Sequence, residues 1–271
     1  MDIKKYTDAN REAWNEAILV HQKARLKKKI DYKKAFAQKG YSTLDKYELA
    51  KLKEIGLKGK RVAQLCCNNG RETLSLINMG AQSGVGFDIS DEAIKEARKL
   101  AEISGLDCEF VRTDVYDIGE EYYDSFDLVY ITIGAMAWLP DLNKFFGVVS
   151  KLLKKNGNLM IYEHHPFCYM LAMEGDDEFD PNNPLKIVHS YFRTEPWVGD
   201  DGIDYIGGTK YKAKTSYDFT NTLMNIINSV ASNGIRIQEY SECGHDISNE
   251  FELQEKEQLI PLCFILLGLK D

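Results

Sequence analysis

Three polar segments that could bind a ligand follow apolar runs in the first half of the chain. They are the turn 68–70, Asp88, and Thr113-Asp114-Val115. A turn that opens a helix presents backbone N–H groups to an anion such as a carboxylate, and Gly70 would let a ligand approach the backbone closely. A strand-tip carboxylate such as Asp88 can accept hydrogen bonds from both hydroxyls of a ribose. Asp114 could accept a hydrogen bond from the adenine amine, and Val115 could pack on the adenine ring. Together they predict an adenosine-containing ligand with an anionic tail.

Each segment also has a purely structural explanation. Asn-Asn-Gly forms ordinary turns, Asp88 with Ser90 could cap the next helix, and Asp114 could simply form a turn. Missing motifs narrow the ligand class. The sequence has no GxGxxG, which disfavours a nicotinamide dinucleotide, no GxxxxGK[ST], which excludes a P-loop, and no GxSxG hydrolase elbow.

Acid–base chemistry is indicated by the segment Glu163-His164-His165-Pro166. Either histidine could act as a general base, because imidazole titrates near neutral pH. Adjacent strand residues point to opposite faces, so one of the two is expected to face a site. A metal centre would need further ligands such as Glu163 and His189, and we expect none.

These residues can form one site only if the fold brings the ends of their strands together. Strand-like apolar runs alternate with amphipathic helical patterns, which predicts a doubly wound α/β sheet that is parallel at its centre. The expected strands are 61–67, 83–89, 107–115, 126–133, 158–165, 235–242 and 259–270. The expected helices are 70–80, 90–105, 141–155 and 218–233. Residues 1–55 are expected to form an N-terminal helical arm, and residues 56–271 the main domain.

The alternation stops at residues 166–216, where turn-rich and acidic segments flank two strand-like runs, 185–193 and 209–217. We expect an insertion with antiparallel strands that covers the sheet edge as a lid over an acceptor pocket. The pocket would be lined by Trp138, Tyr191 and Trp197, with Phe192, Tyr205 and Tyr211 as further aromatic candidates. A small satellite core or a dimer contact is the alternative.

Composition limits the partners. The 271 residues are 44% hydrophobic and 28% charged, with a net charge of −8, which argues against nucleic-acid or anionic-membrane surfaces. The basic segment 21–34 is expected to be a solvated helix face, with a partner-binding arm as the alternative. Six scattered cysteines without a CxxC pair, and no signal or membrane-spanning segment, predict a reduced cytoplasmic protein that is a monomer or homodimer.

Residues 59–166 resemble a class I S-adenosylmethionine-dependent methyltransferase of a bacterial small-molecule-type subgroup. The resemblance is carried by QLCCNNGRETLSLINMGAQSGVGFDIS, FVRTDVYDI, FDLVYITIGAMAWLPDL and LLKKNGNLMIYEHHP, and extends to NREAWNEAILVH and LIPLCFILLGLK. It implies a seven-stranded sheet whose last strand is antiparallel. It also implies S-adenosylmethionine as cofactor, methyl transfer to a small-molecule acceptor, and a place for His164 and His165 beside the reactive methyl group.

The resemblance assigns further residues to the cofactor, although the first motif departs from the family. Three family glycines fall on Cys66, Asn68 and Gly70, and the usual acid of the first strand is Gln64. The implied cofactor-binding residues are Trp14, Cys66, Cys67, Asn68, Gly70, Asp88, Ile89, Thr113, Asp114, Val115, Thr132 and Ile133. Trp14 would close over the cofactor or simply pack its helix on the sheet. The eroded glycines leave a non-catalytic cofactor-binding module as an alternative, with a Rossmann oxidoreductase as a less favoured one.

Overall fold

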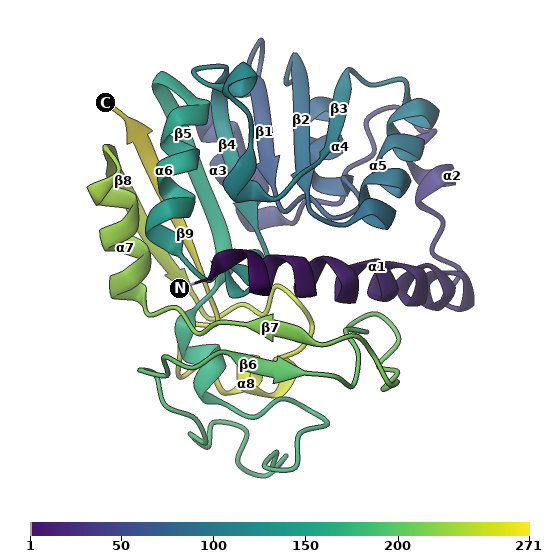
Figure 1. Cartoon of the computed structure of the whole chain (residues 1–271), viewed down its shortest axis with the longest axis vertical. Coiled ribbons are helices and arrows are strands. Elements are labelled where there is room, and N and C mark those ends of the chain that lie inside the picture. Colours follow the sequence, from purple (N-terminus) through teal and green to yellow (C-terminus); the bar gives the residue numbers. More distant parts are fainter. Residues whose placement is uncertain (1) are drawn as a thin grey trace.

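A seven-stranded sheet organises the molecule, which is described by a computed structural model of residues 2–271 (Figure 1). The strands lie in the order β3-β2-β1-β4-β5-β9-β8. Their bounds are β1 Arg61–Leu65, β2 Ser83–Asp88, β3 Cys108–Arg112, β4 Phe126–Thr132, β5 Leu153–His164, β8 Ile235–Cys243 and β9 Cys263–Lys270. Strand β9 is antiparallel to both β5 and β8, while the other pairings are parallel. The predicted mostly parallel sheet with an antiparallel last strand is confirmed.

The strand order places a switch point at the middle of the sheet. From β1 the chain moves outward to β2 and β3, then returns to β4 on the other side of β1. Val62 pairs with both Gly84 of β2 and Leu128 of β4, so these strands are in step. In such sheets ligands bind beyond the carboxyl ends of the strands at the switch point. The groups after β1, β2 and β4 therefore meet at one edge.

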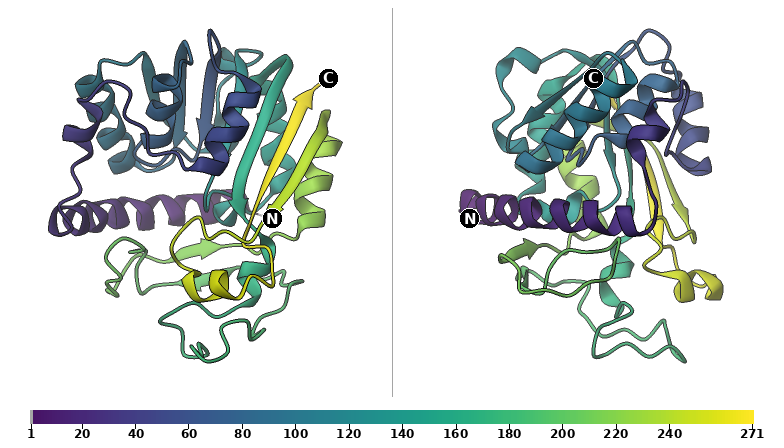
Figure 2. Two further views of the ribbon diagram at one scale, coloured as in Figure 1. Left: turned by 180° about the vertical axis from the view of Figure 1, so that it is seen from behind. Right: turned by 90° about the vertical axis from the view of Figure 1, so that its right-hand side faces the viewer.

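Helices cover both faces of the sheet (Figure 2). One face packs on α6 (Leu142–Leu152) and α7 (Leu223–Ser232). The other packs on α3 (Lys46–Ile55), α4 (Arg71–Asn78) and α5 (Asp91–Ser104), with α2 (Tyr32–Phe36) beside them. Side-chain caps fix where several helices begin, because Ser90 accepts from the Ala93 N–H and Asp141 from the Lys144 N–H.

A long helix, α1 (Ile3–Lys27), lies across the carboxyl edge of the sheet instead of on a face (Figures 1 and 2). Its predicted stripe is buried at Ala17, Ile18, His21 and Ala24, whereas Trp14 is only partly buried. It contacts α5 on one side and the insertion strand β7 on the other. The N-terminal region thus divides into an edge-covering helix and a helix, α3, that belongs to the sheet's own core.

The insertion departs from the prediction. Residues 185–193 and 209–217 do not form the expected strand pair. Instead, Trp197–Gly199 (β6) pairs with Ser216–Asp218 (β7) over three residues. The segment 185–193 lies in turns, and the N–H groups of Val188 and His189 donate to the Met170 carbonyl. A strand-like pattern forms a strand only where a neighbouring backbone is available to pair with it.

Three predicted element boundaries are also corrected. The helix expected over 141–155 ends at Leu152, because the next residue begins β5 and pairs with Phe126. The helix expected over 218–233 begins only at Leu223, after the β7 pairing and a cap by Thr222. The strand expected from residue 259 begins at Cys263, after Pro261, which has no N–H for the sheet.

The turn between β1 and α4 is packed tightly at Gly70. Its φ is +76°, and a Cβ there would overlap the Phe110 ring and touch the Ala97 methyl group. The space that we expected to admit a ligand is therefore filled by an aromatic ring. Gly70 is required by packing as well as by backbone conformation.

We predict that Gly70→Ala destabilises the protein by about 2–5 kcal/mol, combining left-handed backbone strain with overpacking. The matched control is Gly105→Ala, since Gly105 has φ +64° but nothing within 4 Å of its Cβ position. The free energy of unfolding of the control should fall only by the cost of the left-handed backbone, about 1–2 kcal/mol. Urea denaturation of both variants measures the difference, and equal losses would contradict the packing role of Phe110.

Candidate functional site

The turn after β1 has left-handed backbone at each position where the resemblance places a glycine. The φ angles are +55° at Cys66, +49° at Asn68 and +76° at Gly70. The family's glycine pattern therefore reflects a conformation that this chain keeps without two of the glycines. Left-handed backbone costs about 1–2 kcal/mol for most non-glycine residues, and less for asparagine, whose side chain bonds locally. Here the Asn68 side-chain oxygen accepts from the Asn69 N–H at 2.7 Å.

The two adjacent cysteines face different surroundings. Cys67 is fully buried in the cluster that holds Leu74 and Phe110. Burial raises the pKa of the Cys66 thiol, and the carboxylates of Asp88, Asp114 and Glu163 raise it further. The strand-tip acids thus act electrostatically on Cys66, while Cys67 belongs to the core.

Asp88 joins the ends of β1 and β2. Its carboxylate accepts from the N–H groups of Asn68 and Ser90, each at 2.8 Å, and its carbonyl accepts from the Thr113 N–H at 2.9 Å. Burial raises the pKa of Asp88 to about 6, although these amides oppose the rise. Ser90, not Asp88, caps α5. Asp88 therefore fixes the two loops and retains acceptor capacity for a ligand. Ile89, next to it, is partly buried.

Asp114 lies at the tip of β3 and is 5% exposed. It accepts from the Tyr116 N–H at 3.1 Å and from the Lys4 ammonium at 3.1 Å. Val115 is buried beside it. The first turn of α1 thus reaches the acid that the sequence assigned to adenine, a contact that sequence reasoning missed.

Glu163 connects the tips of β4 and β5. It is 1% exposed and accepts from the N–H groups of Gly134, Met136 at 3.2 Å and His164 at 2.9 Å. The sequence offered this residue only as a possible metal ligand. Nearby, the buried Thr132 hydroxyl has no hydrogen-bond partner within residues 2–271, and Ile133 is 38% exposed. The loop after β4 therefore presents both polar and apolar groups to the edge.

The two histidines differ in their partners. His165 is 2% exposed, its Nε2 lies 3.1 Å from Glu242 Oε1, and its Nδ1 accepts from the Phe167 N–H at 3.2 Å. Burial lowers the pKa of His165, although Glu242 opposes this. His164 is 8% exposed, its Nδ1 lies 3.6 Å from Glu163, and its Nε2 has no partner in the described chain. Of the two, His164 is the one with a ring nitrogen left for other chemistry.

Helix α1 is fastened to the edge by ion pairs near both of its ends. Lys4 binds Asp114, and Arg11 lies 2.7 Å from Asp91. Farther along, the buried Arg25 lies 2.6 Å from Glu96, which also accepts from the Asn69 side chain in the glycine turn. The pattern of bases on α1 gave no sequence signal for these partners, because they lie about 70 to 110 residues away in sequence.

An aromatic cluster forms between α1, the loop after β4 and the insertion. Trp14 contacts Trp138 with ring centroids 5.1 Å apart, and Tyr205 contacts both Trp14 and His21. Trp14 and Trp138 are thus brought together as an edge cover.

The other predicted pocket aromatics lie elsewhere in the insertion. The Tyr191 hydroxyl accepts from the Leu223 N–H at 2.9 Å. The Trp197 indole donates to the Thr220 hydroxyl, and the Arg193 guanidinium lies 3.8 Å from its ring centroid. Neither side chain joins the Trp14–Trp138 cluster in these contacts.

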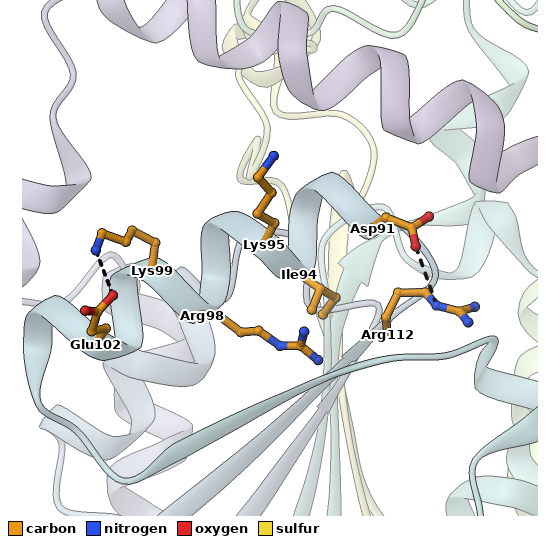
Figure 3. Close-up of a pocket in the computed structure, with 7 residues that line it drawn as sticks. All are labelled: Asp91, Ile94, Lys95, Arg98, Lys99, Glu102 and Arg112. Atoms are coloured by element: carbon orange, nitrogen blue, oxygen red, sulfur yellow. Dashed lines mark hydrogen bonds and ion pairs between the residues drawn. The ribbon is translucent and has the colours of Figure 1, made fainter.

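Two hollows flank this edge. A small cavity of about 10 Å³ lies at the tip of β5 and is lined by Met136, Ala137, Glu163, His164, Pro166, Tyr169, Phe219, Asn221 and Ile226. A wider, open hollow of about 440 Å³ lies on the outer side of α5, where Lys99 pairs with Glu102 and Arg112 with Asp91 (Figure 3). The mutually paired charges make the wider hollow a solvated surface, so the chemistry is assigned to the strand tips.

Two negative findings apply to residues 2–271. Among them, no group of three or more His, Cys, Asp or Glu side chains is placed to hold a metal ion. None of the helices described there is long and apolar enough to cross a membrane.

Comparison with known proteins assigns the chain to a family. Residues 57–193 match a family described as a methyltransferase domain. The ribosomal RNA large subunit methyltransferase I of Aeromonas hydrophila is 31% identical over 121 residues, covering 38% of this chain and 30% of that protein. The ubiquinone biosynthesis O-methyltransferase of Xanthomonas euvesicatoria is 29% identical over 123 residues, covering 45% of this chain and 51% of that protein. The chain thus spans about half or less of the length of these curated relatives.

Solved structures share the fold at low sequence identity. The S-adenosylmethionine-dependent methyltransferase from Mesorhizobium loti is similar with a TM-score of 0.60 and 20% identity, covering 82% of this chain and 97% of that one. Its overlap shows a common architecture.

We predict that Asp88→Ala weakens S-adenosylhomocysteine binding by about 1.5–3 kcal/mol, the worth of hydrogen bonds to a charged group. Wild-type affinity should also fall as the pH drops below about 6, because the carboxylate is then protonated. Calorimetry at several pH values measures both effects. The control Ser90→Ala should lose about 1 kcal/mol of stability with its cap and keep its affinity. Unchanged binding in Asp88→Ala would leave that residue a structural role only.

We predict that His21 makes α1 docking sensitive to acid. Burial lowers the pKa of His21 from 6.5 to about 4. The docked helix therefore holds the imidazole neutral, and its contribution to stability is present above pH 6.5 and lost as the pH falls toward 4. The full loss amounts to about 3 kcal/mol. Amide hydrogen exchange in α1 should accelerate over this range in the wild type but less in His21→Phe. The same acceleration in both proteins would contradict the role of His21.

Proposed function

Because the chain belongs to the family of methyltransferase domains, we propose that it transfers the methyl group of S-adenosylmethionine to a small-molecule acceptor. The observation that supports this best is the set of acids at the strand tips beside the switch point: Asp88 accepts hydrogen bonds from the N–H groups of Asn68 and Ser90, the buried Asp114 follows β3, and the buried Glu163 lies at the end of β5. Asp88 would accept the ribose hydroxyls and Asp114 the adenine amine. The backbone of the turn 68–70 and the Thr132–Gly134 loop would hold the methionine part.

Methyl transfer from a sulfonium is an in-line displacement that needs mainly alignment. Holding two reactants in the right geometry can supply roughly 7–11 kcal/mol of the barrier. Helix α1 supports this alignment because its ion pairs with Asp91 and Glu96 hold it at the sheet edge, where Trp14 contacts Trp138. In this proposal α1 excludes water from the sulfonium and its acceptor.

A small acceptor is supported by how completely the edge is covered. Helix α1 and the insertion lie over the strand tips (Figure 1), and Phe219 and Asn221 of the segment after β7 bind the backbone of Ala137 and Met136. A small molecule fits under such a cover more readily than RNA or a folded protein. The net charge of −8 also disfavours a nucleic-acid acceptor. We place the protein in the cytoplasm as a monomer or homodimer, in keeping with six free cysteines in the described chain.

Within this proposal His164 is the general base, and His165 has a structural role through its contacts with Glu242 and Phe167. His164 lines the small cavity at the tip of β5 and its Nε2 has no hydrogen-bond partner in the described chain, whereas both ring nitrogens of His165 have partners. Glu163 would orient the His164 ring from its Nδ1 side.

Calorimetry with S-adenosylmethionine, S-adenosylhomocysteine, NAD and ATP tests the proposed cofactor. We expect one molecule of either sulfur compound to bind per chain and neither nucleotide to do so. Binding of NAD alone would replace the proposal with an oxidoreductase. Binding of S-adenosylmethionine without turnover of any acceptor in a broad panel would favour a non-catalytic module.

We predict that His164→Gln lowers kcat by about 10²–10⁴-fold, the usual worth of a general base. Affinity for S-adenosylhomocysteine should stay within a factor of a few, since the base touches the acceptor. The matched variant His165→Gln should lose thermal stability but keep the turnover and pH profile of the protein that remains folded. Turnover unchanged in His164→Gln would show that alignment alone carries the reaction.

A further inference from the structure

The sheet brings two cysteines opposite each other that lie far apart in sequence. Cys243 ends β8 and Cys263 begins β9, and the two residues are register partners in this antiparallel pair. Residues directly opposite in antiparallel strands have Cα atoms about 4.5–5.5 Å apart. Disulfides bridge Cα separations of about 4.4–6.8 Å. The backbone at this end of the sheet therefore has the separation that a disulfide needs.

Both side chains also lie on the same face of the sheet. Cys263 belongs to the buried hydrophobic cluster that holds Tyr162 and Ile265, and Cys243 packs against that cluster. Burial raises the pKa of the Cys263 thiol, and the neighbouring Cys243 thiol raises it further. Register and packing thus bring together the two thiols as well as the two backbones.

The two thiols differ in their access to solvent. Cys243 is partly exposed on β8, which is an edge strand, whereas Cys263 is fully buried in β9, the next strand of the sheet. A small oxidant can therefore reach Cys243 first. A partly exposed cysteine beside a second, resolving cysteine is the arrangement typical of reversible thiol oxidation.

We propose that Cys243 and Cys263 are a modification site that forms a reversible disulfide on reaction with a peroxide. Cys243 is the thiol that reacts with the oxidant, and Cys263 is the resolving thiol. The site does not depend on the proposed methyl transfer. Because disulfides in reducing compartments are transient, we expect small thiols to reduce this one again.

The oxidation balances with hydrogen peroxide as the oxidant. The Cys243 thiol releases its proton, and its sulfur bonds to one oxygen of the peroxide while the O–O bond breaks. The hydroxide that leaves takes up this proton and becomes water, and Cys243 is then a sulfenic acid. The Cys263 sulfur next bonds to the Cys243 sulfur while the S–O bond breaks, and the second hydroxide leaves as water with the Cys263 proton. The thiols lose two electrons, which the peroxide gains.

The disulfide would close the segment 244–262, which joins β8 to β9. The Leu262 N–H donates to the Cys243 carbonyl at 2.8 Å, so the two ends of this segment already meet. Within it, Phe251 contacts His164 with ring centroids 5.8 Å apart. A covalent bond across the base of a loop removes its open conformations. Oxidation should therefore hold this segment more firmly against His164.

The test treats the folded protein with hydrogen peroxide, then denatures it in N-ethylmaleimide and measures intact mass and peptide masses. The reduced chain has six cysteines and should take up six maleimides. The oxidised chain should take up two fewer and yield a peptide pair joined through Cys243 and Cys263, and dithiothreitol should reverse both changes. Amide hydrogen exchange in the segment 244–262 should slow by about tenfold or more in the disulfide form.

Cys243→Ser should form no disulfide under the same treatment, and Cys263→Ala gives a second variant should Cys243→Ser fold poorly. The matched control is Cys108→Ser, since Cys108 is also partly exposed on an edge strand but has Gly84 as its register partner. This control should oxidise like the wild type.

Three results would overturn the modification site: an unchanged maleimide count, a sulfinic acid at Cys243 without a disulfide, or a disulfide that joins other cysteines. If the disulfide forms but exchange in the segment 244–262 stays the same, its effect on the contact with His164 is contradicted.

Discussion

A single carboxylate sets the geometry on which the candidate site depends. Asp88 accepts the N–H groups of Asn68 and Ser90, and its own carbonyl accepts the N–H of Thr113. These bonds hold the ends of β1, β2 and β3 in one arrangement. Because both donors to the carboxylate are uncharged amides, it keeps its negative charge at the sheet edge, and burial raises its pKa to about 6. The left-handed turn at Cys66 and Asn68 is stabilised within this frame.

Basic residues of α1 pair with several acids at or near that edge. Asp114 and Glu163 join Asp88 there, and α1 brings Lys4 to one of these acids and Arg25 to Glu96 nearby. The insertion then covers the tip of β5, where Tyr169 and Phe219 line the cavity beside Glu163 and His164. The acids at the centre of the edge thus favour a ligand that carries a positive charge there.

The sheet was predictable from sequence because its strands are buried on both faces and alternate with amphipathic helices, a pattern that the order of apolar and polar residues along the chain reveals. The strand-tip positions of Asp88 and Asp114 followed from the same pattern. The contacts of Lys4 and Arg25 did not, since they depend on where α1 crosses the edge. The insertion strands were wrong because residues 185–193 carry a strand pattern but pair with another segment only at the single bridge between Ile187 and Leu171. Tyr191 and Trp197 were assigned to the pocket by type, whereas their positions depend on local bonds to Leu223 and Thr220.

We propose that the strand tips under α1 bind S-adenosylmethionine with its methyl group facing the cavity that His164 lines. A crystal structure of the protein with S-adenosylhomocysteine tests this most directly. We expect the ribose hydroxyls on Asp88, the adenine beside Asp114 and Val115, and the cofactor sulfur directed toward His164 Nε2. A cofactor bound elsewhere, or one whose sulfur faces away from the tip of β5, would contradict it.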